Sequence, residues 1–208
     1  MKTPKTYAEV TVIQYEQLEQ LKAEKDIEPL DFLISKLSIL TGLSTDEVEQ
    51  MDSKKAFDLN NVFSYADSEF PCYELKQTIT IGKKTFKFCE HLTVAQERDV
   101  LEFTRLNNGF GACLSEILAV VFKEKTNAGY RYISDNHYEN VELFKTAKIK
   151  DISGVIFFYS KILKTLENNL NTYSAPSRKL IIEIEEEMMR DKGFQDFLNS
   201  GGSITTLV

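Results

Sequence analysis

Residues 78–106 constrain the fold of this chain more than any other stretch, because they predict a tight β-hairpin that leads directly into a capped helix. One run alternates isoleucine with threonine, and the return run alternates phenylalanine with polar residues. Gly82 lies between the two runs and supplies the positive φ that a two-residue turn requires. We therefore expect antiparallel strands near 76–81 and 84–89.

Three helix starts carry the capping-box pattern, in which a Ser or Thr and a Gln or Glu three residues later bond each other's backbone N–H. They are Thr11–Gln14, Ser44–Glu47 and Thr93–Gln96. The first and third share the sequence T-V-x-Q and lie about eighty residues apart. This similarity indicates either an internal duplication or two good helix starts of the same kind.

Several further segments repeat apolar residues at three- and four-residue spacing, which is typical of amphipathic helices. They cover residues 30–41, 53–63, 114–122, 137–147, 153–170 and 177–191. Residues 125–136 are polar and predict a loop with short extended structure. The predicted core comprises Leu33, Leu37, Leu40, Leu114, Ile117, Leu118, Val121, Phe158, Ile162 and Leu166.

The predicted fold class is mainly α: a helical bundle with one small antiparallel β-hairpin at about 76–89. A break at Ser174–Ser177, which contains Pro176, follows the longest helix. We therefore expect a helical core domain over 1–171, with the hairpin inserted in it. A C-terminal helix and a flexible tail should occupy 172–208.

The charge of the chain argues against nucleic acid as a partner. The formal net charge is −7 and the pI is about 5.1, whereas nucleic-acid binders carry a basic surface. The sequence contains no dense cluster of Lys and Arg. No apolar run approaches the length of a membrane span, and the first residues lack the apolar stretch of a signal peptide. We expect neither nucleic acid nor membrane as a partner. We expect the protein to be cytoplasmic, or to be assembled in a cytoplasm.

The polar residues show no catalytic or cofactor motif. Cys72, Cys89 and Cys113 match no metal or redox spacing, and Cys113 falls in an apolar helical run that predicts a core position. The two histidines are too scattered for a zinc site. Glu183, Glu186 and Glu187 are either metal ligands or, more simply, a solvated helix face. Glu90 and His91 are either an acid–base pair or a polar junction. We expect no enzyme activity and no cofactor.

The C-terminal stretch offers the clearest protein-binding residues. Phe194, Phe197 and Leu198 present apolar area directly after Gly193. Ile204, Leu207 and Val208 follow a Gly-Gly pair and have the composition of a strand that can pair with a partner's sheet edge. The alternative interpretation of this tail is ordinary terminal disorder.

Four motifs, in the same order, resemble a known group of proteins. They are LSILTGLS at 37–44 followed by Asp46-Glu47, IGKKTF at 81–86, LTVAQ at 92–96 and GVIFF at 154–158. Together they resemble tail assembly chaperones and minor virion proteins of tailed bacteriophages. They are most similar to those of phages that infect Bacteroidetes, including crAss-like phages. The resemblance covers about residues 8–170.

This resemblance implies a non-enzymatic structural or assembly protein that binds other virion proteins of the tail or head–tail region. Other phage structural proteins are the expected partners, with a second copy of the chain as a further candidate. The protein would then be found in the virion, or in the host cytoplasm during assembly. The alternatives are a tail assembly chaperone absent from the mature virion, and a small enzyme or regulatory domain with an unrecognised site.

Overall fold

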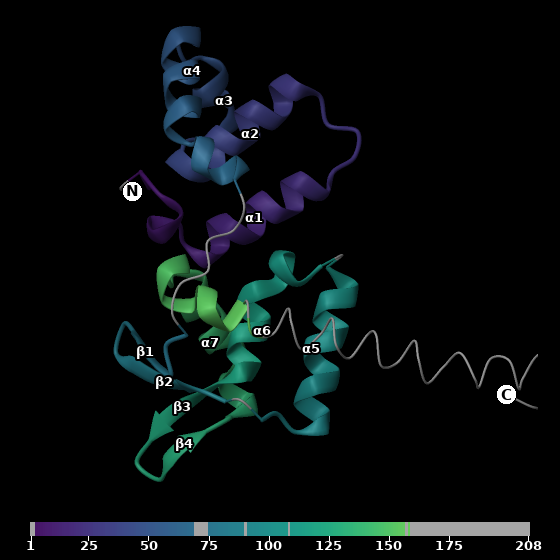
Figure 1. The fold of residues 1–208 in the computed structure, drawn as a ribbon, viewed down its shortest axis with the longest axis vertical. Helices are drawn as coiled ribbons and strands as arrows, with labels where there is room; N and C mark the ends of the chain where they lie inside the picture. The colour runs from purple at the N-terminus through teal and green to yellow at the C-terminus, as the bar shows by residue number, and fades with distance from the viewer. Residues whose placement is uncertain (1–2, 69–74, 90, 108, 157, 159–208) are drawn as a thin grey trace, which may run out of the picture. The chain divides into compact units, whose positions relative to one another are not determined.

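The computed structural model describes residues 3–68, 75–89, 91–107, 109–156 and 158 (Figure 1). The chain divides into two compact units, Met1–Ser160 and Lys161–Val208. The second unit lies outside the described residues, and so does the predicted domain boundary at residue 171. The predicted helix over 177–191 and the tail beyond it also lie outside the described residues.

Helices dominate the first half of the described unit, as the sequence predicts. The α-helices are α1 (Val12–Ala23), α2 (Pro29–Thr41), α3 (Thr45–Glu49) and α4 (Ser53–Val62). Two 3₁₀ turns, η1 (Tyr7–Glu9) and η2 (Ser64–Asp67), flank them. Pro29 occupies the first helical position of α2, and Gly42 ends this helix with a φ of 76°, a conformation that favours glycine.

Strands and helices alternate in the second half. The strands are β1 (Thr78–Ile81), β2 (Lys84–Phe88), β3 (Phe122–Thr126) and β4 (Gly129–Arg131). The helices are α5 (Val94–Leu106), α6 (Leu114–Val121) and α7 (His137–Lys145), and a further helix covers 149–156. The 3₁₀ turns η3 (Phe110–Cys113) and η4 (Ser134–Asn136) lead into α6 and α7.

The three predicted capping boxes are all present. Each Ser or Thr side chain accepts from the backbone N–H three residues on, and each Gln or Glu side chain accepts from the backbone N–H of the cap. The two glutamines make an additional contact that the motif does not predict. Gln14 donates from Nε2 to the carbonyl of Ile39 in α2, and Gln96 donates to the carbonyl of Val120 in α6.

The predicted hairpin is confirmed, but it is not isolated. Gly82 makes the turn with a φ of 58°, and β1 pairs with β2 in antiparallel register. The sheet then continues through β3 and β4, giving four strands in the order β1-β2-β3-β4. The sequence interpretation missed β3 because Phe122 extends the apolar run of α6, so that the strand looks like the end of a helix. Residues 125–136, predicted as a loop with short extended structure, contain the end of β3 and all of β4.

The core is centred on α6, where every residue except Glu116 is buried. The inner face of the sheet packs on α7, with the Phe144 ring 4.9 Å from Phe86 and 5.4 Å from Phe122 between ring centroids. Six of the predicted core residues are buried: Leu37, Leu40, Leu114, Ile117, Leu118 and Val121. Leu33 and Phe158 are only partly buried, and Ile162 and Leu166 lie outside the described residues.

Candidate functional site

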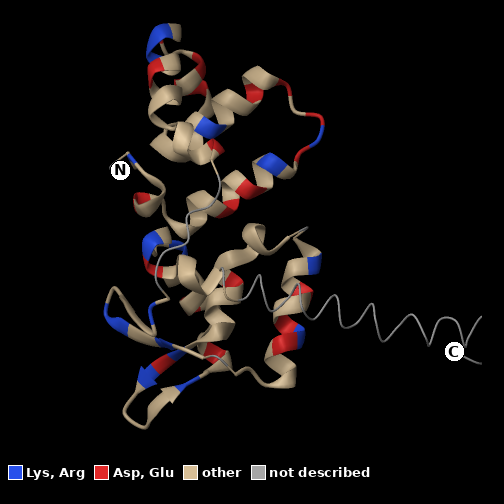
Figure 2. Cartoon of the chain, in the orientation of Figure 1, with Lys and Arg blue, Asp and Glu red and all other residues tan. Residues whose placement is uncertain are grey.

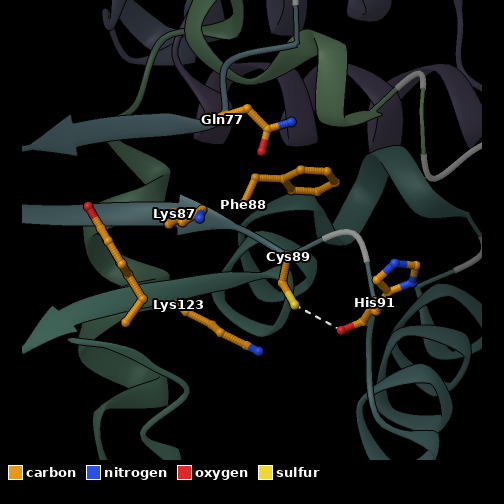
Figure 3. Close-up of a pocket in the computed structure, with 7 residues that line it drawn as sticks. Gln77, Lys87, Phe88, Cys89, His91 and Lys123 are labelled. Atoms are coloured by element: carbon orange, nitrogen blue, oxygen red, sulfur yellow. Dashed lines mark hydrogen bonds between the residues drawn. The ribbon is translucent and has the colours of Figure 1, made fainter. Parts of the chain in front are cut away.

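The outer face of the sheet carries the clearest candidate binding site, a hollow of about 480 Å³. Strand alternation places Lys87 and Lys123 on this face, because Phe86, Phe88 and Phe122 turn inward and are buried. The hollow also reaches the end of β2, where Phe88 borders it. The hollow lies where β2 leads toward α5 (Figure 3). Its lining residues are Gln77, Lys87, Phe88, Cys89, His91, Lys123 and Tyr130.

The strand register brings the polar members of this site together. Lys87 on β2 is directly opposite Lys123 on β3, and Tyr130 on β4 is directly opposite Lys125. The Lys87 Nζ atom lies 5.9 Å from the centroid of the Tyr130 ring, within the range of a cation–π contact. The site is therefore a basic surface beside an aromatic ring.

A second hollow of about 490 Å³ extends the site toward the start of α5. Both hollows are lined by Lys123 and Tyr130, and the second adds Arg131 and Tyr132. Burial raises the pKa of the Tyr132 hydroxyl, and the nearby Asp99 carboxylate acts in the same direction. The two hollows are neighbours, because Lys123 and Tyr130 line both of them. We call the two together the groove.

Cys89 and His91 share the groove, but their geometry is not that of a nucleophile and its base. The Cys89 Sγ atom donates to the main-chain oxygen of His91 at 2.8 Å, and Figure 3 shows this bond ending at the backbone rather than at the imidazole ring. A thiol activated by histidine needs its hydrogen bond to a ring nitrogen. Glu90, the predicted partner of His91 in an acid–base pair, lies outside the described residues.

Cys113 has the core position that the sequence predicts. It is 2% exposed, and its thiol donates to the carbonyls of Gly109 and Phe110. Burial raises the pKa of this thiol to about 12, and the nearby carboxylates of Glu116 and Glu16 add to the shift. Cys113 is thus a thiol, not a thiolate, at neutral pH.

Large apolar side chains are exposed on α2 and α4. Leu30 is 66% exposed, Phe57 61% and Val62 51%. All ten residues of α4 are described and none of them is buried, although Lys36 of α2 reaches Asn60 of this helix at 3.1 Å. Apolar groups on an exposed helix face are candidates for contact with another protein.

The partner-binding residues predicted from the sequence are not among the residues that the structure describes. Phe194, Phe197, Leu198, Ile204, Leu207 and Val208 lie outside the described residues, as do Glu183, Glu186 and Glu187. Among the described residues, no three His, Cys, Asp or Glu side chains are grouped so that they could hold a metal ion. Within the same ranges, no helix has both the length and the apolar content to cross a membrane.

The sequence interpretation missed the groove residues Lys87, Lys123 and Tyr130. The detectable signal was the alternation in KTFKF at 84–88 and FKEKT at 122–126, which places lysines on the face opposite the phenylalanines. Fold and groove together define a mainly α-helical protein with a small antiparallel sheet whose outer face is basic.

No family model matches the chain, and neither a curated protein nor a solved structure is significantly similar to it.

Proposed function

We propose that this protein is a non-enzymatic component of tailed-bacteriophage particle assembly that binds other virion proteins of the tail or head–tail region. The sequence resemblance over residues 8–170 suggests the class. The observation that supports it in the structure is α4, which buries none of its residues and exposes Phe57 and Val62. Because burial of large apolar groups drives protein association, such a helix suits a contact with a partner.

The proposed contact has two parts, α4 and the C-terminal stretch 193–208. Phe57 is the residue of α4 best suited to anchor a partner, since aromatic side chains, Phe among them, are enriched at protein interfaces. The C-terminal part rests on Phe194, Phe197, Leu198, Ile204, Leu207 and Val208. In this proposal other phage structural proteins are the partners, and a second copy of the chain is a further candidate.

Binding assays with purified virion proteins encoded beside this chain would test the proposal. Phe57→Ser should weaken binding at least about tenfold, as expected for an anchor residue, while the unfolding midpoint stays unchanged because the side chain is exposed. Lys54→Ser, on the same helix, is the matched control and should bind like the wild type. Deleting 199–208 should leave stability nearly unchanged and weaken assembly. Normal binding by both the Phe57 and the deletion variants would contradict the proposal.

Mass spectrometry of purified particles separates the two roles within this proposal. A virion component is recovered with the mature particle in a fixed ratio to the other structural proteins. A tail assembly chaperone is present in infected cells and absent from the purified particle.

A further inference from the structure

Basic residues are concentrated on the sheet, although the chain as a whole is acidic. The four strands contain five Lys or Arg residues and one acidic residue, Glu124, while the net charge of the chain is −7. Figure 2 shows blue segments on the strands, whereas the helices carry both red and blue segments. The lysines come from strands far apart in the sequence, so only the fold gathers them.

The lysines of the two sheet faces differ in their surroundings. Lys84, on the inner face, is neutralised by Glu124 and Glu139, each 3.2 Å away. Lys87, Lys123 and Lys125 share the outer face, and none of the three forms an ion pair with any other described residue. The fold therefore leaves three cations without a counter-charge in the described part of the chain.

The register of Lys87 opposite Lys123 is unfavourable for the fold itself. Like charges directly opposite each other on neighbouring strands destabilise a sheet, and this pair is directly opposite. A bound anion would remove the repulsion, because it neutralises both ammonium groups at once. This register would therefore be more favourable with a bound anion than without one.

The aromatic residues of the same face narrow the class of ligand. Tyr130 is 37% exposed and lies beside Lys87 in the groove, and Tyr132 follows it two residues later on the same face. Flat aromatic rings beside cations match the two parts of a nucleotide, because bases stack on the rings and phosphates bind the ammonium groups. Only unpaired bases can stack in this way.

We propose that the outer face of the sheet binds single-stranded nucleic acid, with phosphates on Lys87, Lys123 and Lys125 and a base stacked on Tyr130. The proposal is independent of the α4 contact. It differs from the expectation based on net charge, because charges further away than about 8 Å are largely screened at physiological ionic strength. Local charge then decides binding at the groove.

Fluorescence anisotropy with the full chain and a labelled oligodeoxythymidine of about 20 nucleotides, longer than the site of a typical single-strand binding fold, tests this. Three phosphate contacts predict a slope of about −2 in a plot of log K against log salt concentration between about 50 and 200 mM. Lys87→Ala and Lys123→Ala should each reduce the steepness by about 0.7. Tyr130→Ala should weaken binding at least about fivefold, while Tyr130→Phe keeps the stacking ring and the affinity.

The double variant Lys54→Ala/Lys55→Ala is the control, since it removes two cations from α4 and leaves the sheet intact; it should bind like the wild type. Circular dichroism should show that every variant is folded.

Absence of wild-type binding at the lowest salt overturns the proposal, and so does binding that the Lys87 and Lys123 substitutions leave unchanged. A third outcome also overturns it: polyglutamate displaces the oligonucleotide as well as unlabelled oligonucleotide does, and Tyr130→Ala leaves the affinity unchanged. The ligand would then be an acidic protein segment. Preference for duplex over single strands also overturns it.

Discussion

Gln14 on α1 and Gln96 on α5 make the same pair of contacts, although about eighty residues separate them in the chain. Each Oε1 atom accepts from the backbone N–H of its capping threonine, and each Nε2 atom donates to a carbonyl near the end of a neighbouring helix. Carbonyls in the last turn have no partner within their own helix. Each glutamine therefore joins the start of one helix to the end of another.

Gln96→Glu separates the two contacts of this glutamine. A Glu side chain still accepts from the cap, as Glu47 does in the Ser44 box, but its carboxylate cannot donate to the buried carbonyl of Val120. We expect a loss of about 1–3 kcal/mol in the free energy of unfolding, the usual cost of an unsatisfied buried acceptor. Denaturant unfolding at neutral pH measures it.

Glu47→Gln is the control for that experiment, because the Ser44 box is exposed and its acidic member makes only the capping contacts described for it. This exchange should change stability by less than about 0.5 kcal/mol. Equal effects of the two substitutions would show that the contact with Val120 contributes nothing.

Glu16 on α1 caps the start of α6. Glu16 is 4% exposed and its carboxylate accepts from the backbone N–H of Ser115. Cys113, the N-cap residue of α6, makes no side-chain capping bond. Burial raises the pKa of Glu16, and the hydrogen bonds from Ser115 oppose this shift. The native state therefore binds this proton more tightly than the unfolded chain does.

The stabilising contribution of that proton is complete below about pH 4.3, the ordinary pKa of a Glu, and is lost as the pH rises through the raised pKa. Glu16→Gln cannot ionise and still offers an oxygen to Ser115. The stability of this variant relative to the wild type should therefore increase from about pH 4.3 to pH 7. Denaturant unfolding of both proteins at each pH measures the difference. A difference that does not vary with pH would contradict the pKa shift.

Leu118 tests the packing of α6. Its side chain is completely buried, so Leu118→Ala removes apolar contacts and leaves a cavity, at a cost of about 2–5 kcal/mol. Leu30→Ala is the matched control at a side chain that is 66% exposed, and it should cost less than about 0.5 kcal/mol. Similar values for the two would mean that α6 is not the centre of the core.

Local signals account for what the sequence predicted correctly. A capping box involves four consecutive residues, so Thr11, Ser44 and Thr93 could be assigned as helix starts without knowledge of the fold. The hairpin likewise depends only on alternation and on Gly82. The position of α6 in the core also follows from local pattern, since a helix that is apolar on nearly every side has to be surrounded by other elements.

Contacts between distant segments could not be predicted in this way. Lys36 looks like an ordinary helix lysine, yet it is 3% exposed and its ammonium group lies 2.6 Å from Asp67. The groove depends on the pairing of β2 with β3, whose residues are more than thirty positions apart. Alternation can place the lysines on one face of each strand. Neither the contact of Lys36 with Asp67 nor the pairing of β2 with β3 leaves a pattern in the sequence, because each is created when separate elements pack together.

His137 at the start of α7 stacks on Phe103, with 5.9 Å between ring centroids and an interplanar angle of 7°. Its Nδ1 atom is buried and has no hydrogen-bond partner among the described residues. Burial lowers the pKa of this histidine, while the carboxylates of Glu116 and Asp99 oppose the shift. The native state thus favours the neutral imidazole more than the unfolded chain does.

The stabilising effect of the neutral ring is present above about pH 6.5, the ordinary pKa of a histidine, and is lost as the pH falls toward the lowered native pKa. His137→Phe retains a ring against Phe103 and does not titrate, so its stability relative to the wild type should increase as the pH falls below about 6.5. Tyr138→Phe, an aromatic exchange at an exposed neighbour, should keep the wild-type pH dependence. Thermal unfolding of the three proteins across this pH range tests the prediction. If the unfolding temperatures of the wild type and His137→Phe change with pH in parallel, protonation of His137 does not oppose folding.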